Sequence, residues 1–178
     1  GISANWCFSI ITIENSIIAD NNGNGFQCTT SSFSIINNQI LRDTTGIFFT
    51  GNQTSYFRLN NIIGNTIGMS NNYTNGTNYT TVDSNNFDNS NYNFENGSLS
   101  SFTFENNWWG STNTDTINAS IMDIYDNINL GLVDYDPFLT TPDTAAPPIP
   151  TQNVQITSSG YNYVNLSWDT SAIGDLAG

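Results

Sequence analysis

The chain of 178 residues has no lysine and no histidine, and its only basic side chains are Arg42 and Arg58. Its 15 acidic residues give a formal net charge of −13. Proteins bind nucleic acids and anionic membrane surfaces through cationic side chains, so this composition excludes both classes of partner. Without histidine, these residues cannot form a zinc site of the usual kind or a histidine-activated serine or cysteine nucleophile.

Long apolar runs and cysteines are also scarce. No segment approaches the roughly 18 to 20 apolar residues that a spanning helix needs, so we expect no membrane insertion. Cys7 and Cys28 can form one disulfide at most, if they lie on neighbouring turns of a repeat, and two buried free thiols are the alternative. Because the sequence runs from Gly1 to Gly178 with both ends outside any clear element, we expect a fragment of a larger secreted protein.

Small polar residues dominate instead, since Asn, Ser and Thr make up roughly 40 % of the chain. Such a composition can bury enough apolar surface only if short apolar strands recur between polar turns. Five segments share an Asn followed two residues later by a large apolar side chain: ITIENSII, SIINNQIL, RLNNIIG, VDSNNFD and FTFENNWW. The asparagines are separated by 21 to 24 residues and are Asn15, Asn38, Asn61, Asn85 and Asn106.

Each repeat has room for two or three strands and none for a helix. The alternating β-branched and aromatic residues indicate strands that bury one face, and a second apolar patch follows in the early repeats. We therefore predict an all-β parallel solenoid in which the repeated asparagines stack as a ladder at sharp bends. Asp83 interrupts the fourth repeat, so we expect that repeat to shift by one residue and bury Val82.

The repeats resemble those of right-handed parallel β-helix proteins, and the stretch NNWWGSTNTDTINASIMDIYDNINLGLVDYDPFLTTP is similar to the end of such domains. The resemblance implies that residues 1–142 are the last turns and cap of a right-handed β-helix, with Trp108 and Trp109 in the core and cap. A short capping helix is also indicated by the residues themselves. Thr114 or Asp115 is its expected N-cap, and the apolar stripe consists of Ile117, Ile121 and Ile124.

The C-terminal part has a different composition. Residues 143–152 form a proline-rich linker, which should be extended and semi-rigid. The pattern from residue 153 to residue 178 resembles the first two strands of a fibronectin type III domain, and this resemblance implies that Trp168 is a core residue.

Carboxylates supply the candidate chemistry. Asp20 and Asp43 follow their asparagines at similar distances, so stacked turns would bring them together as a calcium site or as an acid and base pair; solvated turn residues are the alternative. Calcium is thus the one cofactor that the sequence suggests. The acidic side chains near the cap raise the same question, and these are Asp123, Asp126, Asp134 and Asp136. For Arg42 and Arg58 we expect ion pairs with neighbouring aspartates.

Three tyrosines in a polar stretch, Tyr73, Tyr79 and Tyr92, are candidate platforms for sugar stacking. The sequence favours an extracellular module, secreted or at a cell surface, that binds polysaccharide or a cell-surface glycan and has no evident catalytic site. One alternative is a polysaccharide lyase or glycoside hydrolase with its site on further N-terminal turns. Another is a structural stalk or adhesin segment. The fold alone does not choose among them.

Overall fold

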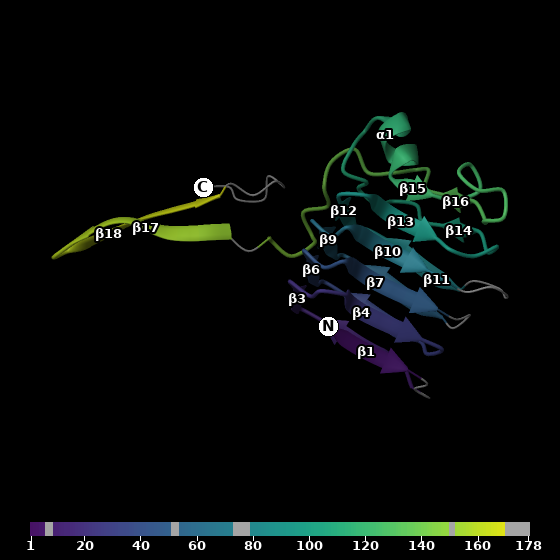
Figure 1. The fold of residues 1–178 in the computed structure, drawn as a ribbon, viewed down its shortest axis with the longest axis horizontal. Coiled ribbons are helices and arrows are strands. Elements are labelled where there is room, and N and C mark those ends of the chain that lie inside the picture. Colours follow the sequence, from purple (N-terminus) through teal and green to yellow (C-terminus); the bar gives the residue numbers. More distant parts are fainter. Residues whose placement is uncertain (6–8, 51–53, 73–78, 150–151, 170–178) are drawn as a thin grey trace. The chain divides into compact units, whose positions relative to one another are not determined.

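A computed structural model describes residues 1–5, 9–50, 54–72, 79–149 and 152–169, and the chain divides into two compact units, 1–147 and 148–178. The first unit is a parallel β-solenoid of about four turns, which confirms the predicted fold class (Figure 1). The right-handed sense that the family resemblance implies stays a prediction.

Three parallel sheets form the walls of the solenoid, and neighbouring strands in each sheet come from successive turns. The first sheet contains β1 (Ile2–Asn5), β4 (Asn24–Thr29), β7 (Thr45–Thr50), β10 (Ile67–Asn71), β13 (Tyr92–Asn96) and β15 (Ile121–Met122). The second contains β2 (Ile11–Glu14), β5 (Phe33–Ile36), β8 (Ser55–Arg58) and β11 (Thr80–Asp83). The third contains β3 (Ile17–Ala19), β6 (Gln39–Leu41), β9 (Asn61–Ile63) and β12 (Asn86–Asp88). A pair of short strands, β14 (Phe102–Thr103) and β16 (Val133–Asp134), continues the coil near its end.

Equivalent side chains stack along the interior because the strands pair in register. In the third sheet one column contains Ile18, Ile40, Ile62 and Phe87. The ring of Trp109 extends this column by stacking on Phe87, with 4.8 Å between ring centroids. A column in the first sheet contains Phe26, Ile47, Met69, Phe94 and Ile121. Each column buries apolar surface continuously, which is the main stabilising contribution in a repeat fold.

The strand register corrects the alignment predicted from the asparagines. The asparagine alignment places Ile17, two residues after Asn15, in the interior, but Ile17 is 62 % exposed and Ile18 occupies the interior instead. Trp109 is buried as predicted, whereas Trp108 is only partly buried and forms a bridge with Asn86. Val82 is buried, as the interruption at Asp83 predicted.

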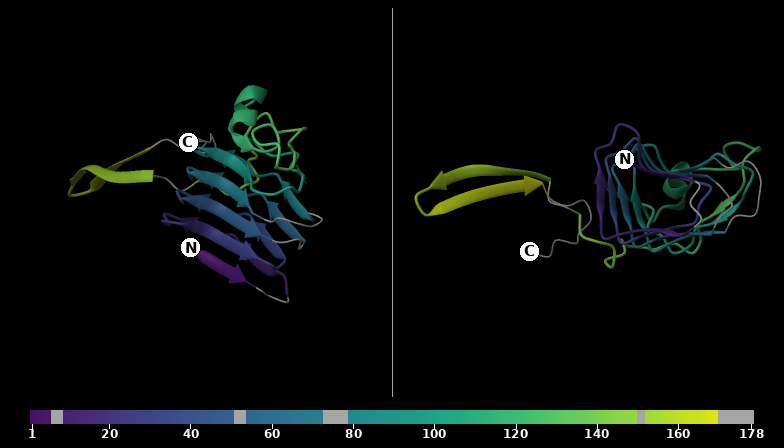
Figure 2. Two further views of the ribbon diagram at one scale, coloured as in Figure 1. Left: turned by 45° about the vertical axis from the view of Figure 1, so that its right-hand side comes forward. Right: turned by 90° about the horizontal axis from the view of Figure 1, so that it is seen from below.

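The predicted capping helix exists and is short. Helix α1 (Thr114–Ala119) is capped by Asn113, whose side chain accepts hydrogen bonds from two backbone N–H groups, so the prediction of Thr114 or Asp115 as N-cap is wrong by one or two residues. The helix lies across the end of the coil (Figure 2) and buries Ile117 completely. Because the helix ends at Ala119, Ile121 belongs to β15 and Ile124 is 40 % exposed.

The start of the predicted linker packs on the solenoid. Asn86 accepts a hydrogen bond from the backbone N–H of Asp143 at 2.7 Å and donates one to its carbonyl at 3.0 Å. Asn61 donates to the carbonyl of Pro147, and Ala146 is buried. We therefore place residues 143–147 with the first unit, where the sequence suggested an extended spacer.

The second unit contains one antiparallel hairpin, β17 (Gln152–Gly160) paired with β18 (Tyr163–Asp169). The two strands agree with the sequence pattern, but the structure does not support the fibronectin type III assignment. Trp168, expected in a core, is 53 % exposed. In the first unit Cys28 is a free, buried thiol, and Cys7 lies outside the described residues. None of the helices in the described ranges has the length and hydropathy needed to cross a membrane.

Candidate functional site

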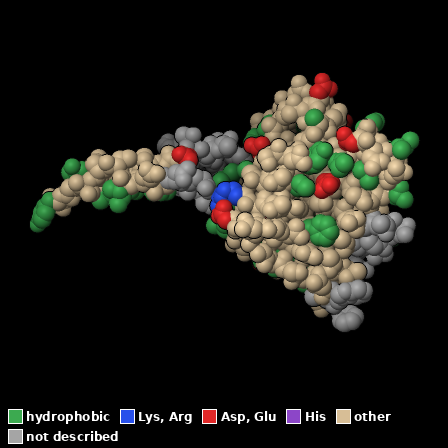
Figure 3. Space-filling model, viewed as in Figure 1, with side chains coloured by type: hydrophobic (Ala, Val, Ile, Leu, Met, Phe, Trp, Pro, Cys, Tyr) green, Lys and Arg blue, Asp and Glu red, His purple; other side chains and the backbone are tan. Residues whose placement is uncertain are grey.

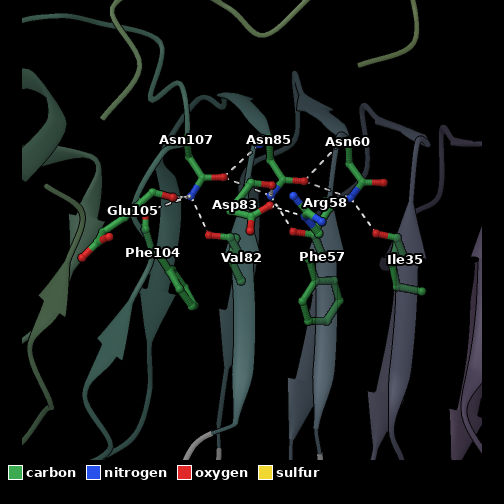
Figure 4. A network of polar contacts seen from close by, with 10 residues as sticks. All are labelled: Ile35, Phe57, Arg58, Asn60, Val82, Asp83, Asn85, Phe104, Glu105 and Asn107. Carbon is green, nitrogen blue, oxygen red and sulfur yellow. Dashed lines mark hydrogen bonds and ion pairs between the residues drawn. The ribbon is translucent and has the colours of Figure 1, made fainter. Parts of the chain in front are cut away.

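A ladder of buried asparagines runs along the corner between the second and third sheets, which we call the first corner (Figure 4). Its members are Asn38, Asn60, Asn85 and Asn107, and all four are fully buried. The Oδ1 atoms of Asn60, Asn85 and Asn107 each accept two hydrogen bonds from the preceding turn; for example, Asn85 accepts from the backbone N–H of Asn60 at 3.0 Å and from its Nδ2 at 2.9 Å. Asn38 Oδ1 accepts one, from the backbone N–H of Ser16 at 3.0 Å. Ladders of this kind satisfy the backbone groups that a sharp bend leaves unpaired.

The prediction of an asparagine ladder is confirmed, but its membership needs correction. Asn38 and Asn85 are members, whereas Asn61 follows the ladder position and begins β9. Asn15 and Asn106 precede the ladder position and have positive φ angles of 52° and 57°. The sequence alignment failed because each corner contains two consecutive positions that favour Asn, one for its left-handed backbone and one for its amide.

A second ladder, which the sequence did not reveal, follows the corner between the third and first sheets. This second corner contains Asn21, Asp43, Asn65, Asn89 and, at its end, Asn93. Three glycines of the first sheet lie beside it and leave room for the ladder side chains: Gly25, Gly46 and Gly68. Their regular spacing of 21 and 22 residues was the available signal for this second ladder.

Asp20 and Asp43 do not stack on each other. Asp20 aligns with Arg42, which donates to its two carboxylate oxygens at 2.7 and 2.6 Å. Asp43 aligns with Asn21 and accepts from its backbone N–H and its Nδ2. The predicted stacking of the two aspartates is therefore wrong by one residue of register, and the calcium or acid–base role suggested for them stays a prediction. The expected ion pairs of the arginines are confirmed by Arg42, which binds Asp20, and by Arg58, which binds Asp83.

The sugar-stacking role suggested for the three tyrosines stays a prediction. Tyr73 lies outside the described residues. Tyr79 is 57 % exposed and precedes β11 of the second sheet, whereas Tyr92 is partly buried at the beginning of β13 in the first sheet.

A cavity of about 870 Å³ lies at the cap, between α1, β15 and the segment around β16. Its lining includes Asn118, Tyr125, Asp126, Asp134, Tyr135 and Phe138. Tyr125 stands at the rim and is 86 % exposed. Tyr135 is fixed within the wall, because its hydroxyl donates to Asn118 Oδ1 at 2.8 Å and its ring packs edge to face against Trp109.

Asp123 builds one wall of this cavity. Its two carboxylate oxygens accept hydrogen bonds from the backbone N–H groups of Tyr125 and Val133, both at 2.9 Å. Asp126 accepts in turn from the N–H of Asp123. Asp123 therefore shapes the loop that carries Tyr125.

The cavity is electronegative. Four aspartates line it, at positions 123, 126, 134 and 136. Burial is the largest cause that raises the pKa of Tyr135, and the nearby carboxylates add to it. The Tyr135 hydroxyl therefore keeps its proton to a higher pH than an ordinary tyrosine does. Within the described residues, no three His, Cys, Asp or Glu side chains gather closely enough to hold a metal ion, and the cap aspartates give no support to the calcium hypothesis.

Comparison with known proteins adds no relative: no family model matches the chain, and neither do any curated proteins or solved structures. Any function must therefore be argued from the residues of the cavity and of the surface.

Proposed function

We propose that this chain is an extracellular β-solenoid module that binds a neutral polysaccharide or cell-surface glycan at the cap cavity. The observation that carries the proposal is the combination of an exposed aromatic ring, Tyr125, with amide and carboxylate oxygens around one open cavity. Sugars bind proteins in this way, because their C–H faces pack on aromatic rings and their hydroxyls donate to oxygen acceptors.

The charge of the cavity favours a neutral ligand. A uronate or sulfate group would face aspartates, and both arginines of the chain are already paired with Asp20 and Asp83. Neutral hydroxyls, in contrast, find strong acceptors in carboxylates such as Asp126 and Asp134. The visible face of the molecule is mainly neutral and polar (Figure 3), which suits a protein that works outside the cell among glycans.

The proposal is tested by affinity electrophoresis of the 178-residue chain in gels that contain neutral or uronate-rich polysaccharides. We expect retardation in at least one neutral gel and about a tenfold weaker affinity after Tyr125→Ala, because an aromatic anchor is lost. Tyr161→Ala is the matched control, since Tyr161 is fully exposed in the hairpin turn.

Equal retardation of Tyr125→Ala and the unaltered chain would overturn the assignment of the cavity. Stronger binding to uronate polymers would overturn the assignment of a neutral ligand. The polysaccharides are also recovered and sized, because shortened chains would establish the hydrolase or lyase alternative. No retardation in any gel would favour a structural segment.

A further inference from the structure

The second corner has one ladder position where a hydrogen-bond donor is replaced by an acceptor. Asp43 occupies it, with 3 % of the residue exposed. Its Oδ1 behaves like an amide oxygen and accepts from the backbone N–H of Asn21 at 2.7 Å and from Asn21 Nδ2 at 2.8 Å. Its Oδ2 is buried without a hydrogen-bond partner. A buried oxygen of this kind costs stability unless a proton is supplied.

The neighbouring turns show what the missing donor does. Asn65 Nδ2 donates to the carbonyl of Ile40 at 3.1 Å, and Asn89 Nδ2 donates to the carbonyl of Ile62 at 2.8 Å. Ile18, Ile40 and Ile62 occupy the same register position in the third sheet. The carbonyl that corresponds to Asp43 is therefore that of Ile18, and an ionised Asp43 presents a second acceptor to it.

The surroundings leave Oδ2 no alternative position. A Cβ atom added at Gly25 would lie 2.1 Å from this oxygen, so the first sheet closes the site on that side. The corresponding glycines in the next two turns, Gly46 and Gly68, lie against Asn65 Nδ2 and Asn89 Nδ2. Oδ2 of Asp43 thus sits where the neighbouring turns place a donor nitrogen.

We propose that Asp43 is a proton-dependent member of the second ladder: as a neutral acid, its Oδ2–H donates to the Ile18 carbonyl as the neighbouring amides do, and loss of the proton breaks that link. The solenoid is therefore tightened at this turn under acidic conditions and loosened as the pH rises.

The charges around Asp43 act in both directions. Burial is the largest influence and raises the pKa of Asp43, and the charge of Asp20 raises it further. The two hydrogen bonds from Asn21 lower this pKa, as does the positive charge of the N-terminal ammonium group. That ammonium group binds Asn21 Oδ1 at 2.6 Å, and Arg42 adjoins Asp43 in the chain. The net result is a pKa above the ordinary 3.8.

The sign of the pH dependence follows from this shift. Between the ordinary pKa of 3.8 and the raised value, the folded chain binds more protons at this site than the unfolded chain does. The contribution of Asp43 to the stability of the folded chain is complete below pH 3.8 and falls as the pH rises through this window. Above the raised pKa it stays constant at its lower value.

The decisive variant is Asp43→Asn, which supplies a permanent donor. Urea unfolding is measured from about pH 3.5 to pH 8. We expect the folding equilibrium constant of Asp43→Asn to exceed that of the unaltered chain about tenfold at pH 8 and to approach it at the acidic end. Glu14→Gln, at an exposed position of β2, is the control for removing one negative charge.

A gap between Asp43→Asn and the unaltered chain that does not change with pH, or that Glu14→Gln reproduces, would overturn the proposal. The reciprocal variant Asn65→Asp keeps the test open if Asp43→Asn does not fold. It moves the same carboxyl to the next turn and should add a second loss of stability with rising pH. An Asn65→Asp chain whose loss of stability is independent of pH would also contradict the proposal.

Discussion

The two corners of the solenoid solve the same problem with different side chains. At both corners a residue with positive φ precedes the ladder position in most turns, Asn89 being the exception. In the first corner the left-handed positions are Asn15, Asn37, Leu59, Ser84 and Asn106, and in the second they include Asp20, Arg42 and Gly64. The recurring requirement is thus a backbone geometry followed by an acceptor oxygen, and residue identity is secondary.

The ladders differ in how they end. In the first corner, Asn107 directs its Nδ2 to three carbonyls of the chain, those of Val82, Phe104 and Glu105. In the second corner, Asn93 takes the register position that glycine holds in earlier turns and accepts from Asn89. Its Nδ2 then donates to the Trp109 carbonyl at 3.0 Å. The end of a ladder can therefore be supplied from another strand, which a repeat pattern does not show.

Removing one ladder amide from each corner should give the largest change in the free energy of unfolding, and the two corners should differ in the size of this change. The side chain of Asn85 makes five hydrogen bonds, and that of Asn65 makes three. Asp43 supplies only its backbone N–H to Asn65, and Asn65 has no counterpart to the bond from Asn85 Nδ2 to the Asp83 carbonyl. We expect Asn85→Ala to lower the free energy of unfolding by about 4 kcal/mol and Asn65→Ala by about 2 kcal/mol. Urea unfolding measures both, with the exposed Asn129→Ala as a control near zero. Equal losses would mean that the corners are equivalent.

The glycine column sharpens the comparison, because the first corner has no counterpart to it among the described residues. A Cβ at Gly46 would lie 2.7 Å from the Gly68 carbonyl oxygen and 3.1 Å from Asn65 Nδ2. Gly46→Ala should therefore lower the free energy of unfolding by about 2 kcal/mol. Gly23→Ala is the matched control, since nothing lies within 4 Å of its added Cβ. If Gly46→Ala leaves the free energy of unfolding unchanged, the side chains of the second ladder tolerate displacement.

The sequence predicted the repeat, the parallel coil and the capping helix because apolar periodicity is local information. The predicted alignment of the repeats was wrong by one residue in some turns, because each bend can carry two adjacent asparagines with different roles. Asn37 has the left-handed backbone of the bend, whereas Asn38 joins the ladder. The expected stacking of Asp20 on Asp43 was wrong for the same one-residue error.

The cap cavity could be predicted only in part. Its aspartates were visible as an acidic cluster after the helix, but the contribution of Tyr125 and Tyr135 depends on how the chain returns to the last turn. The hydrogen bond between Asp123 and Val133 that brings these segments together spans ten residues and belongs to no repeat. The docking of residues 143–147 on Asn61 and Asn86 joins segments 57 to 86 residues apart and likewise belongs to no repeat.

Leu59 offers a smaller and stabilising change in the first corner. Its φ of 54° is a left-handed conformation that costs a side chain such as Leu about 1 kcal/mol or more, and Asn tolerates it better. Equivalent positions in other turns hold Asn15, Asn37 and Asn106. We expect Leu59→Asn to raise the free energy of unfolding by about 0.5 to 1 kcal/mol in thermal or urea unfolding, after the loss of some partly buried apolar surface. A destabilised variant would show that packing, and not backbone strain, dominates at this corner.

The smallest effect should come from Asp20, and its direction should oppose that of Asp43. The hydrogen bond from Arg42 is the main reason that the pKa of Asp20 is lowered from 3.8, so its contribution is present above that pH and declines as the pH falls. The pair is exposed and screened by solvent, so Asp20→Asn should leave stability almost unchanged at neutral pH and moderate salt. Urea unfolding at low and high salt, at pH 3 and pH 7, measures this. A large loss in the free energy of unfolding at pH 7 that salt does not reduce would show that the second corner depends on this ion pair as much as on its ladder. A negligible loss, beside a large effect of Asp43→Asn, would assign the pH response of this corner to the buried carboxyl of Asp43 alone.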